Sequence, residues 1–163
     1  MRHHRKIKTL LVANRGEISI RVMRAAHELG IKTVSIYSQE DRFSLHRMKA
    51  DEAYLVGEGK GPVEAYLGID DIVRVALECG ADAIHPGYGF LAENPAFAEA
   101  CADAGLLFIG PTPDIMRRLG NKVTARDLAT SAGVPVMPAT PPLPLDHAKV
   151  RELAAQAGYP VML

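Results

Sequence analysis

The sequence predicts an α/β protein with a doubly wound parallel sheet, and three observations favour this class. The apolar run at residues 7–13 passes through the polar turn Asn14-Arg15-Gly16 directly into a helical pattern that opens at Glu17. A strand that leads straight into a helix is the first unit of such a sheet. Strand-like and helical patterns then follow in the order β-α-β-β-α-β-α-β. The strands are short, continuous apolar runs, which is typical of a sheet covered on both faces.

The helix after the opening turn has an apolar face and a charged face. The apolar residues at helical spacing, which we expect to pack on the sheet, are Ile18, Val22, Ala25, Ala26 and Leu29. The charged residues, at steps of four, three and four, are Glu17, Arg21, Arg24 and Glu28. The charged row is either a solvated face with i,i+4 ion pairs or a polar subunit interface.

Four more strands are expected at residues 32–37, 51–56, 81–84 and 106–109, with a polar loop at 38–51. An amphipathic helix that ends at Gly80 is expected to bury Ile69, Ile72, Val73, Ala76 and Leu77. Asn94 and Pro95 predict the N-cap and first residue of the next helix. That helix should bury Phe97, Ala98 and Cys101.

The pattern changes at Thr112, so we divide the chain into residues 6–111 and residues 112–163. Thr112 and Pro113 open a short helix with Ile115, Met116 and Leu119, and Asn121 caps a second helix with Val123, Leu128 and Ala129 inward. A proline-rich segment, 134–144, precedes a last helix that Asp146 opens. The chain reaches Leu163 within an apolar strand-like stretch. We therefore expect it to be the front part of a longer protein.

Composition narrows the function classes. Lys plus Arg and Asp plus Glu both number 19, so the net charge is zero and gives no footprint for nucleic acid or an anionic membrane. Cys79 and Cys101 form neither a disulfide framework nor a zinc motif. No apolar run approaches a membrane span, and the basic start MRHHRKIK lacks a signal-peptide core. A cytoplasmic location is the expectation.

Candidate site residues lie in loops and at helix starts. The turn at Asn14 and Arg15 offers a helix N-terminus that can bind an anion, although a purely structural turn fits the same residues. Tyr88 and Gly89 follow a strand, where glycine allows a ligand to come close to the backbone. Lys122 lies near a helix N-terminus, where the dipole disfavours a cation. Either a bound anion or simple solvation of the ammonium group would explain a lysine at this position.

Ordered motifs along the whole chain carry a family resemblance. They are VANRGEI, R-V-x-R-A with E-L-G-I, DRFSLHRMKADEAYLVG, AIHPGYGFLAEN, FIGP, GNKVTAR, AGVPVMPAT and GYPVML. Together they resemble the biotin carboxylase domain of biotin-dependent carboxylases, from about Lys6 to Leu163. The segments GEGKGPVEAYL, SLHRMKADEAYL and PATPPLP are more similar to pyruvate carboxylases than to acyl-CoA carboxylases, which stay the alternative.

The resemblance implies a Rossmann-like pre-ATP-grasp domain followed by the truncated start of an ATP-grasp region. Such domains use MgATP and bicarbonate to form carboxyphosphate and then carboxylate N1 of biotin. Lys122 matches a lysine that contacts ATP phosphates. Arg24 and Glu28 match dimer-interface positions, and Tyr88 and Gly89 lie in a loop that faces the active site. The resemblance assigns no catalytic residue and no metal ligand to this chain, because those residues lie further along the family's domain.

The parent protein is thus expected to be an ATP-dependent ligase, and this chain alone is expected to be inactive. Its expected partners are the remaining ATP-grasp, carboxyltransferase and biotin carrier domains of the same polypeptide, in a homo-oligomer. In a pyruvate carboxylase the carboxyl group passes to pyruvate and gives oxaloacetate. The alternative from another class is a stand-alone Rossmann-like binding or dimerisation module without catalysis.

Overall fold

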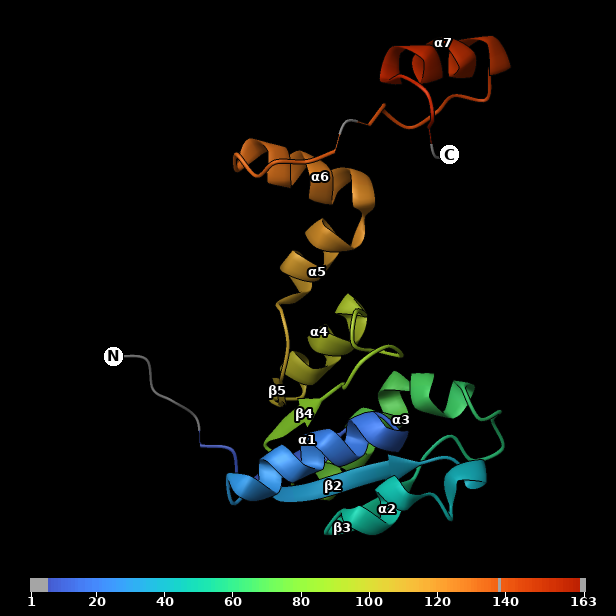
Figure 1. Cartoon of the computed structure of the whole chain (residues 1–163). Helices are drawn as coiled ribbons and strands as arrows, with labels where there is room; N and C mark the ends of the chain where they lie inside the picture. Colours follow the sequence, from blue (N-terminus) through green and yellow to red (C-terminus); the bar gives the residue numbers. More distant parts are fainter. Residues whose placement is uncertain (1–5, 138, 162–163) are drawn as a thin grey trace. The chain divides into compact units, whose positions relative to one another are not determined.

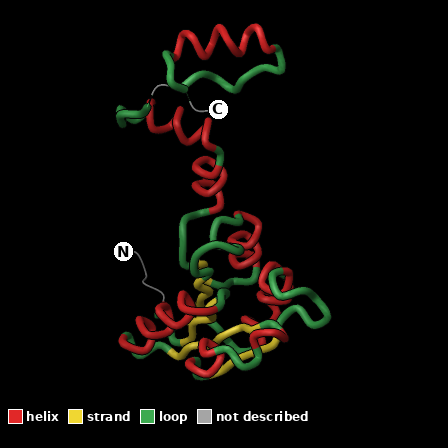
Figure 2. The backbone as a smooth tube through the Cα atoms, turned by 45° about the vertical axis from the view of Figure 1, so that its right-hand side comes forward, coloured by secondary structure: helices red, strands yellow, loops and turns green. Residues whose placement is uncertain are grey.

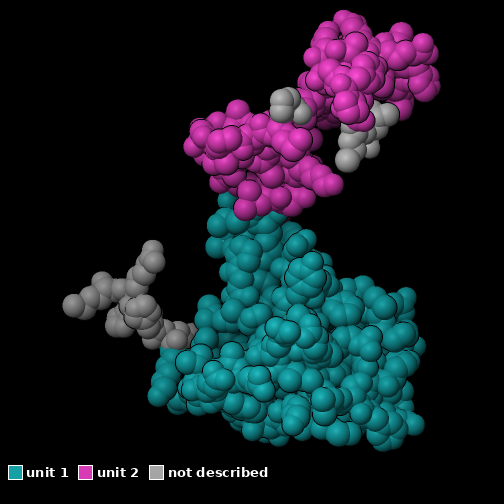
Figure 3. Space-filling model, viewed as in Figure 1, with its two compact units in different colours: residues 1–116 teal, residues 117–163 magenta. Residues whose placement is uncertain are grey.

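The computed structural model describes residues 6–137 and 139–161. The first five residues of the basic start and the last two residues of the expected C-terminal strand-like stretch lie outside this range. The chain forms two compact units, one ending at Met116 and the other beginning at Arg117 (Figure 3). The expected domain boundary after residue 111 stays a prediction.

The first unit is built on a five-stranded parallel sheet (Figures 1 and 2). Its strands are β1 (Thr9–Val12), β2 (Lys32–Tyr37), β3 (Glu52–Leu55), β4 (Ala83–His85) and β5 (Leu107–Phe108). They lie in the order β3-β2-β1-β4-β5, and every pair is parallel. In the register, Leu10 lies between Thr33 of β2 and Ala83 of β4. The predicted parallel α/β class is therefore confirmed.

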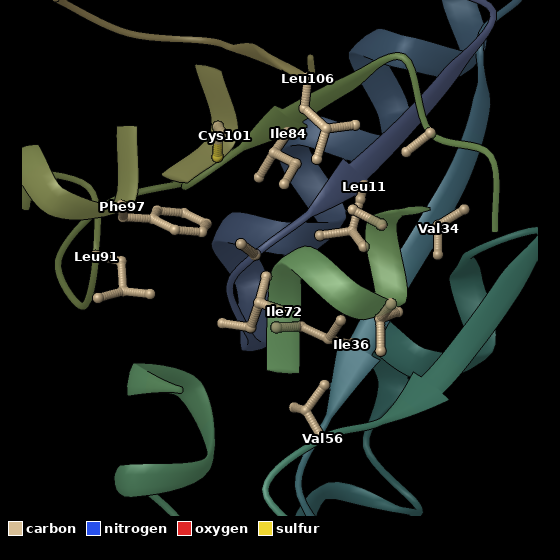
Figure 4. Packing of buried hydrophobic residues seen from close by; sticks show 14 of the residues in the cluster. Leu11, Val34, Ile36, Val56, Ile72, Ile84, Leu91, Phe97, Cys101 and Leu106 are labelled. Atoms are coloured by element: carbon tan, nitrogen blue, oxygen red, sulfur yellow. The ribbon is translucent and has the colours of Figure 1, made fainter. Parts of the chain in front are cut away.

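Helices cover both faces of this sheet. Because side chains alternate along a strand, Leu10 and Leu11 point to opposite faces. Leu10 packs in a small cluster with Ala26 of α1 (Gly16–Glu28). Leu11 belongs to a larger cluster, which also contains Ile72 of α3 (Ile69–Glu78) and Phe97 of α4 (Pro95–Asp103). Figure 4 shows the side chains of this larger cluster gathered in one interior.

The predicted apolar face of α1 is partly wrong. The buried residues are Ser19, Met23 and Ala26, whereas Leu29 is 76% exposed. Ala26 lies in the small cluster with Leu10 and Ala83, and Val22 is partly buried against that cluster. An open apolar groove of about 410 Å³ borders this side of the helix, and its lining includes Val22, Leu29 and Ile109.

The region between β2 and β3 also departs from the predicted loop. It contains the 3₁₀ turn η1 (Gln39–Asp41) and the short helix α2 (Leu45–Lys49). The imidazole of His46 is buried, and its Nε2 lies 3.3 Å from the carbonyl oxygen of Ile36 in β2. A helix of five residues is too short to show a clear periodicity in the sequence, and its formation depends on tertiary packing.

Two predictions about the other helices have different outcomes. Asn94 caps α4 as expected, because its Oδ1 accepts from the N–H groups of Ala96 and Phe97. The three residues expected to be buried in α4, Phe97, Ala98 and Cys101, are buried. In α3, however, Leu77 is exposed, and Val75 is buried in its place. The other four predicted residues of α3, Ile69, Ile72, Val73 and Ala76, belong to the larger cluster or pack against it.

The second unit contains the end of α5 (Pro113–Gly120), then α6 (Lys122–Ser131) and α7 (His147–Ala157). Asn121 and Asp146 cap α6 and α7, as expected. The expected inward face of α6 is wrong, because Val123 is 47% exposed and Leu128 and Ala129 are only half-buried. Short segments have too little apolar surface to enclose a core. Among the described residues, no helix is long and apolar enough to cross a membrane.

Candidate functional site

The strand order reverses at β1, the central strand, and the crevice at the carboxyl end of this strand is where a ligand is expected. β1 lies between β2 and β4, so the chain leaves β1 in one direction and returns to its other side. In open parallel sheets, ligands bind beyond the carboxyl ends of the strands where the order reverses in this way. Two loops meet there: the turn Asn14-Arg15-Gly16 after β1, and residues 85–90 after β4.

The side chain of Asn14 joins these two loops. It is only 3% exposed, and its Nδ2 donates to the carbonyl oxygens of Pro86 at 2.8 Å and Tyr88 at 3.0 Å. Its Oδ1 accepts from the N–H of Arg15 at 2.9 Å. Both donor hydrogens of the amide are thus used on the second loop, and the oxygen is used on the first.

The loop of residues 85–90 has an unusual backbone. Gly87 and Gly89 have φ values of 69° and 71°, and Phe90 has a φ of 44°. A Cβ at Gly87 would lie 2.6 Å from Asn14 Nδ2, so only glycine fits at that position. For Phe90, the left-handed region costs about 1–2 kcal/mol. Such a conformation persists only where surrounding contacts determine it.

Two further contacts hold the loop. The N–H of Gly87 donates to His85 Nδ1 at 3.0 Å, and burial lowers the pKa of His85, which favours the neutral ring that this bond needs. The ring of Phe90 stacks on Tyr66 with a centroid distance of 5.3 Å. Tyr66 lies in the 3₁₀ turn η2 (Glu64–Leu67). The loop is therefore anchored at both ends.

Asp41 binds Tyr66, the residue on which Phe90 stacks, and it also binds Ser44 and Arg15. Its Oδ1 accepts from Ser44 Oγ and pairs with Arg15 Nη2, both at 2.7 Å, and its Oδ2 accepts from Tyr66 OH at 2.7 Å. Burial raises the pKa of Asp41, but the hydrogen bonds from Ser44 and Tyr66 and the charge of Arg15 outweigh it and lower the pKa overall. Burial and the bond to Asp41 raise the pKa of Tyr66. The pair therefore holds an ionised carboxylate and a neutral phenol at neutral pH.

The predicted site residues occupy separate places. Tyr88 is 79% exposed and Gly89 is exposed, and both lie at the carboxyl edge of the sheet. Lys122 is exposed at the first position of α6, in the second unit. Arg24 and Glu28 are exposed on α1 and have no hydrogen bond or ion pair to any described residue. Within the same helix, Arg21 pairs with Glu17 at 2.9 Å.

Sequence reasoning missed Asp41 and Tyr66, and it placed Phe90 in the loop without giving it a role. Asp41 and Tyr66 are 25 residues apart, in segments without strand or helix periodicity, so no local signal connects them.

Among the residues that the structure describes, no group of three His, Cys, Asp or Glu side chains could hold a metal ion. Cys101 is not activated, because burial raises its pKa to about 11.

Comparison with known proteins defines the class of this domain. Residues 6–116 match the family described as biotin carboxylase, N-terminal domain. This match covers the whole described part of the first unit, including both loops at the crevice. The chain therefore belongs to the biotin carboxylase N-terminal domain family.

The similar full-length proteins are carboxylases. The mitochondrial pyruvate carboxylase of Mus musculus is 54% identical over 160 residues, which cover 98% of this chain and 14% of that protein. A Rhizobium etli pyruvate carboxylase structure, with the allosteric activator acetyl coenzyme A, superposes with a TM-score of 0.86 at 60% identity. It covers 94% of this chain and 14% of its own. The predicted resemblance to biotin carboxylase domains, and to pyruvate carboxylases in particular, is confirmed.

A third relative extends the comparison to another acceptor. The biotin carboxylase domain dimer of Hydrogenobacter thermophilus 2-oxoglutarate carboxylase, in complex with MgADP, ADP and bicarbonate, has a TM-score of 0.89 at 45% identity. The superposition covers 96% of this chain and 34% of that one. The present chain thus spans about a seventh of the length of the pyruvate carboxylases that it matches.

Proposed function

We propose that this chain forms the N-terminal part of a biotin carboxylase module in a pyruvate carboxylase. The module uses ATP and bicarbonate to carboxylate biotin, and a carboxyltransferase domain passes the carboxyl group to pyruvate. The observation that carries the proposal is 54–60% identity to pyruvate carboxylases along nearly the whole chain. The similarity to the 2-oxoglutarate carboxylase domain makes 2-oxoglutarate a second candidate acceptor, and acyl-CoA carboxylases stay the other alternative.

The described residues fit only part of the ligand set. Lys122 is an exposed ammonium group beside the N-terminus of α6, which suits the phosphates of ATP. The family resemblance implies that the residues that hold Mg²⁺ and the biotin ring lie outside this chain, and among the described residues no group of three His, Cys, Asp or Glu side chains could hold a metal ion. Bound MgATP supplies the phosphoryl group that activates bicarbonate. The contribution of this chain is to hold phosphate at Lys122 and to present the loop with Tyr88 and Gly89.

The direct test is bicarbonate-dependent ATP hydrolysis. We expect none from the 163-residue chain alone, and activity from the carboxylase polypeptide that contains it. In that polypeptide, Lys122→Gln should raise KM for MgATP about tenfold, because one charge-assisted phosphate contact is lost. Lys149→Gln, at an exposed position of α7, is the matched control and should leave KM unchanged. Hydrolysis by the isolated chain would contradict the proposal and favour a self-contained enzyme.

Arg24 and Glu28 are proposed to lie in a homo-oligomer interface. Both are exposed on one face of α1 without an internal partner among the described residues, as interface charges are before assembly. Arg24→Glu should weaken self-association in sedimentation experiments on the carboxylase polypeptide. Lys49→Glu, which makes the same charge change on α2, should not. Equal effects of the two substitutions would remove Arg24 from the interface.

The cellular location is a separate proposal. We propose that the protein acts in the cytoplasm, in the same compartment as the other carboxylase domains. The mouse relative is described as mitochondrial, so cell fractionation with an antibody to this chain is the appropriate measurement. Recovery in a mitochondrial fraction would overturn the cytoplasmic assignment and leave the enzymatic proposal intact.

A further inference from the structure

Asn14 is the residue that ties the two halves of the crevice together. Its amide group spans from the turn after β1 to two carbonyl groups of the loop after β4, those of Pro86 and Tyr88. These carbonyl groups lie on either side of Gly87, whose α-carbon faces the Asn14 side chain so closely that no Cβ fits. The amide and the glycine therefore form one close contact between segments about 72 residues apart.

We propose that Asn14 is a positioning residue for biotin carboxylation. Its amide holds residues 85–90 in the shape that presents Tyr88 and Gly89 to the substrates. This inference rests on the proposed function, because it assumes that the loop faces the reacting groups. Asn14 itself is 3% exposed and acts through the loop.

The chemistry of the contact requires an amide of this length. Two carbonyl oxygens need two donors from one uncharged group, and the NH₂ of asparagine supplies both. A carboxylate of the same shape would place acceptors against acceptors, and alanine would leave both carbonyl groups without their donor. Gln carries the same group one methylene further out, so its NH₂ would not lie where the NH₂ of Asn14 meets the two carbonyl oxygens.

The bonds of Asn14 act on the loop and not on the core. Leu11 and Ile84, in the strands that precede the two loops, belong to the larger cluster and are enclosed by other apolar groups. Phe90 has a separate anchor on Tyr66 at the far end of the loop. Loss of the Asn14 amide should therefore loosen residues 86–89 while the sheet beneath stays folded. That separation distinguishes positioning from general stability.

The first experiment uses the 163-residue chain. Asn14→Asp is compared with Asn94→Asp, which makes the same chemical change at the α4 N-cap, where only the side-chain oxygen is used. In ¹⁵N relaxation, we expect the order parameters of the Gly87 and Gly89 amides to fall from about 0.85 to below about 0.6 in Asn14→Asp only. Unchanged order parameters in Asn14→Asp would overturn the inference.

A second variant covers the case in which Asn14→Asp does not fold. Gly87→Ala approaches the same contact from the loop, where its methyl group meets the Asn14 side chain. It should loosen the same amides, and it should do so less when Asn14→Ala has already removed the amide group, which holds two of the three Asn14 atoms that the methyl group would meet. Such non-additivity is expected for residues in contact. Additive effects of the two substitutions would show that the contact does not hold the loop.

The second experiment measures turnover in the carboxylase polypeptide with MgATP, bicarbonate and free biotin. Asn14→Asp should lower kcat by about 10- to 100-fold, as small misplacements of reacting groups do. KM for MgATP should stay within about twofold, since Lys122 belongs to the other unit. If the decrease in kcat is caused by unfolded protein, it should vanish at temperatures well below the thermal midpoint of the variant. If it is caused by lost positioning, it should persist at those temperatures. Asn94→Asp should match wild type.

The outcomes separate the inference from the function on which it rests. An inactive wild-type polypeptide overturns the proposed function, whatever the loop measurement gives. An active wild type with full turnover in Asn14→Asp overturns the positioning role alone. A loosened loop together with lowered kcat supports both.

Discussion

The two units of the chain differ in how they are held. In the first, the sheet and its helices enclose side chains such as Leu11, Ile84 and Phe97 on one face and Ala26 and Ala83 on the other. In the second, α6 and α7 have well-formed caps, but none of the described residues from Arg117 onward is buried. Local signals are enough to start a helix, whereas a stable unit requires an enclosed apolar interior. The first unit should therefore carry most of the measured stability.

The largest expected effect comes from a matched pair of leucines. Leu11→Ala removes a fully buried side chain from β1 and should lower the free energy of unfolding by about 2–5 kcal/mol. Leu119→Ala, in the second unit, removes a side chain that is 53% exposed and should change it by less than about 0.5 kcal/mol. Urea unfolding followed by far-ultraviolet circular dichroism measures both. Similar losses would mean that the second unit shares the core of the first.

An intermediate effect is expected at Asp41. Asp41→Asn weakens the bonds from Ser44, Tyr66 and Arg15 and should lower the free energy of unfolding by about 1–3 kcal/mol at neutral pH. Asp127→Asn, at an exposed position of α6, is the control and should be neutral.

The pH dependence of the Asp41 effect has a defined sign. The folded-state pKa of Asp41 lies below its unfolded-state value, which is about 3.9 for an ordinary aspartate. The ionised carboxylate therefore contributes stability above the unfolded-state pKa, and this contribution is lost as the pH falls through the folded-state pKa. The difference between wild type and Asp41→Asn should be constant above about pH 5 and should shrink below about pH 4. A difference that grows on acidification would contradict this assignment.

The smallest expected effect compares two asparagine caps. Asn94→Ala should destabilise the first unit by about 1 kcal/mol, because α4 packs on the core. Asn121→Ala removes an equivalent cap from α6 and should reduce helical signal without moving the main unfolding transition. Thermal unfolding followed by circular dichroism at 222 nm separates the two. A shift of the main transition in Asn121→Ala would show that the units unfold together.

The sequence predicted the parts of this fold that depend on local signals. The five strands, the caps at Asn94, Asn121 and Asp146, and the buried face of α4 all follow from apolar runs and capping residues. The strand order did not follow, because it depends on which distant segments pair. The face of α6 is predicted incorrectly, and that of α1 only in part correctly, for a related reason. Periodicity identifies an apolar row, but packing partners decide whether that row is buried.

The residues of the candidate site also fall into those with a local sequence signal and those that depend on contacts between distant segments. Tyr88 and Gly89 stay predicted site residues, and that prediction rests on a local pattern, a glycine-rich loop directly after a strand. Asp41 and Tyr66 were missed because their contact joins irregular segments that are distant in the sequence. The sequence places Asn14 in the turn, but no local pattern indicates that its amide reaches Pro86 and Tyr88. Contacts between loops become visible only once the strand order is known.

The position of β1 at the centre of the sheet has a kinetic consequence. β1 precedes its partners along the chain, yet its pairing with β4 joins residues about 73 positions apart, as for Leu10 and Ala83. Non-local pairing of this kind slows folding, because chain entropy is lost before the contact is made. During synthesis, one side of β1 must wait until residues 83–85 have been added. Until then an apolar strand has an open edge, which is the period in which this domain is most exposed to aggregation.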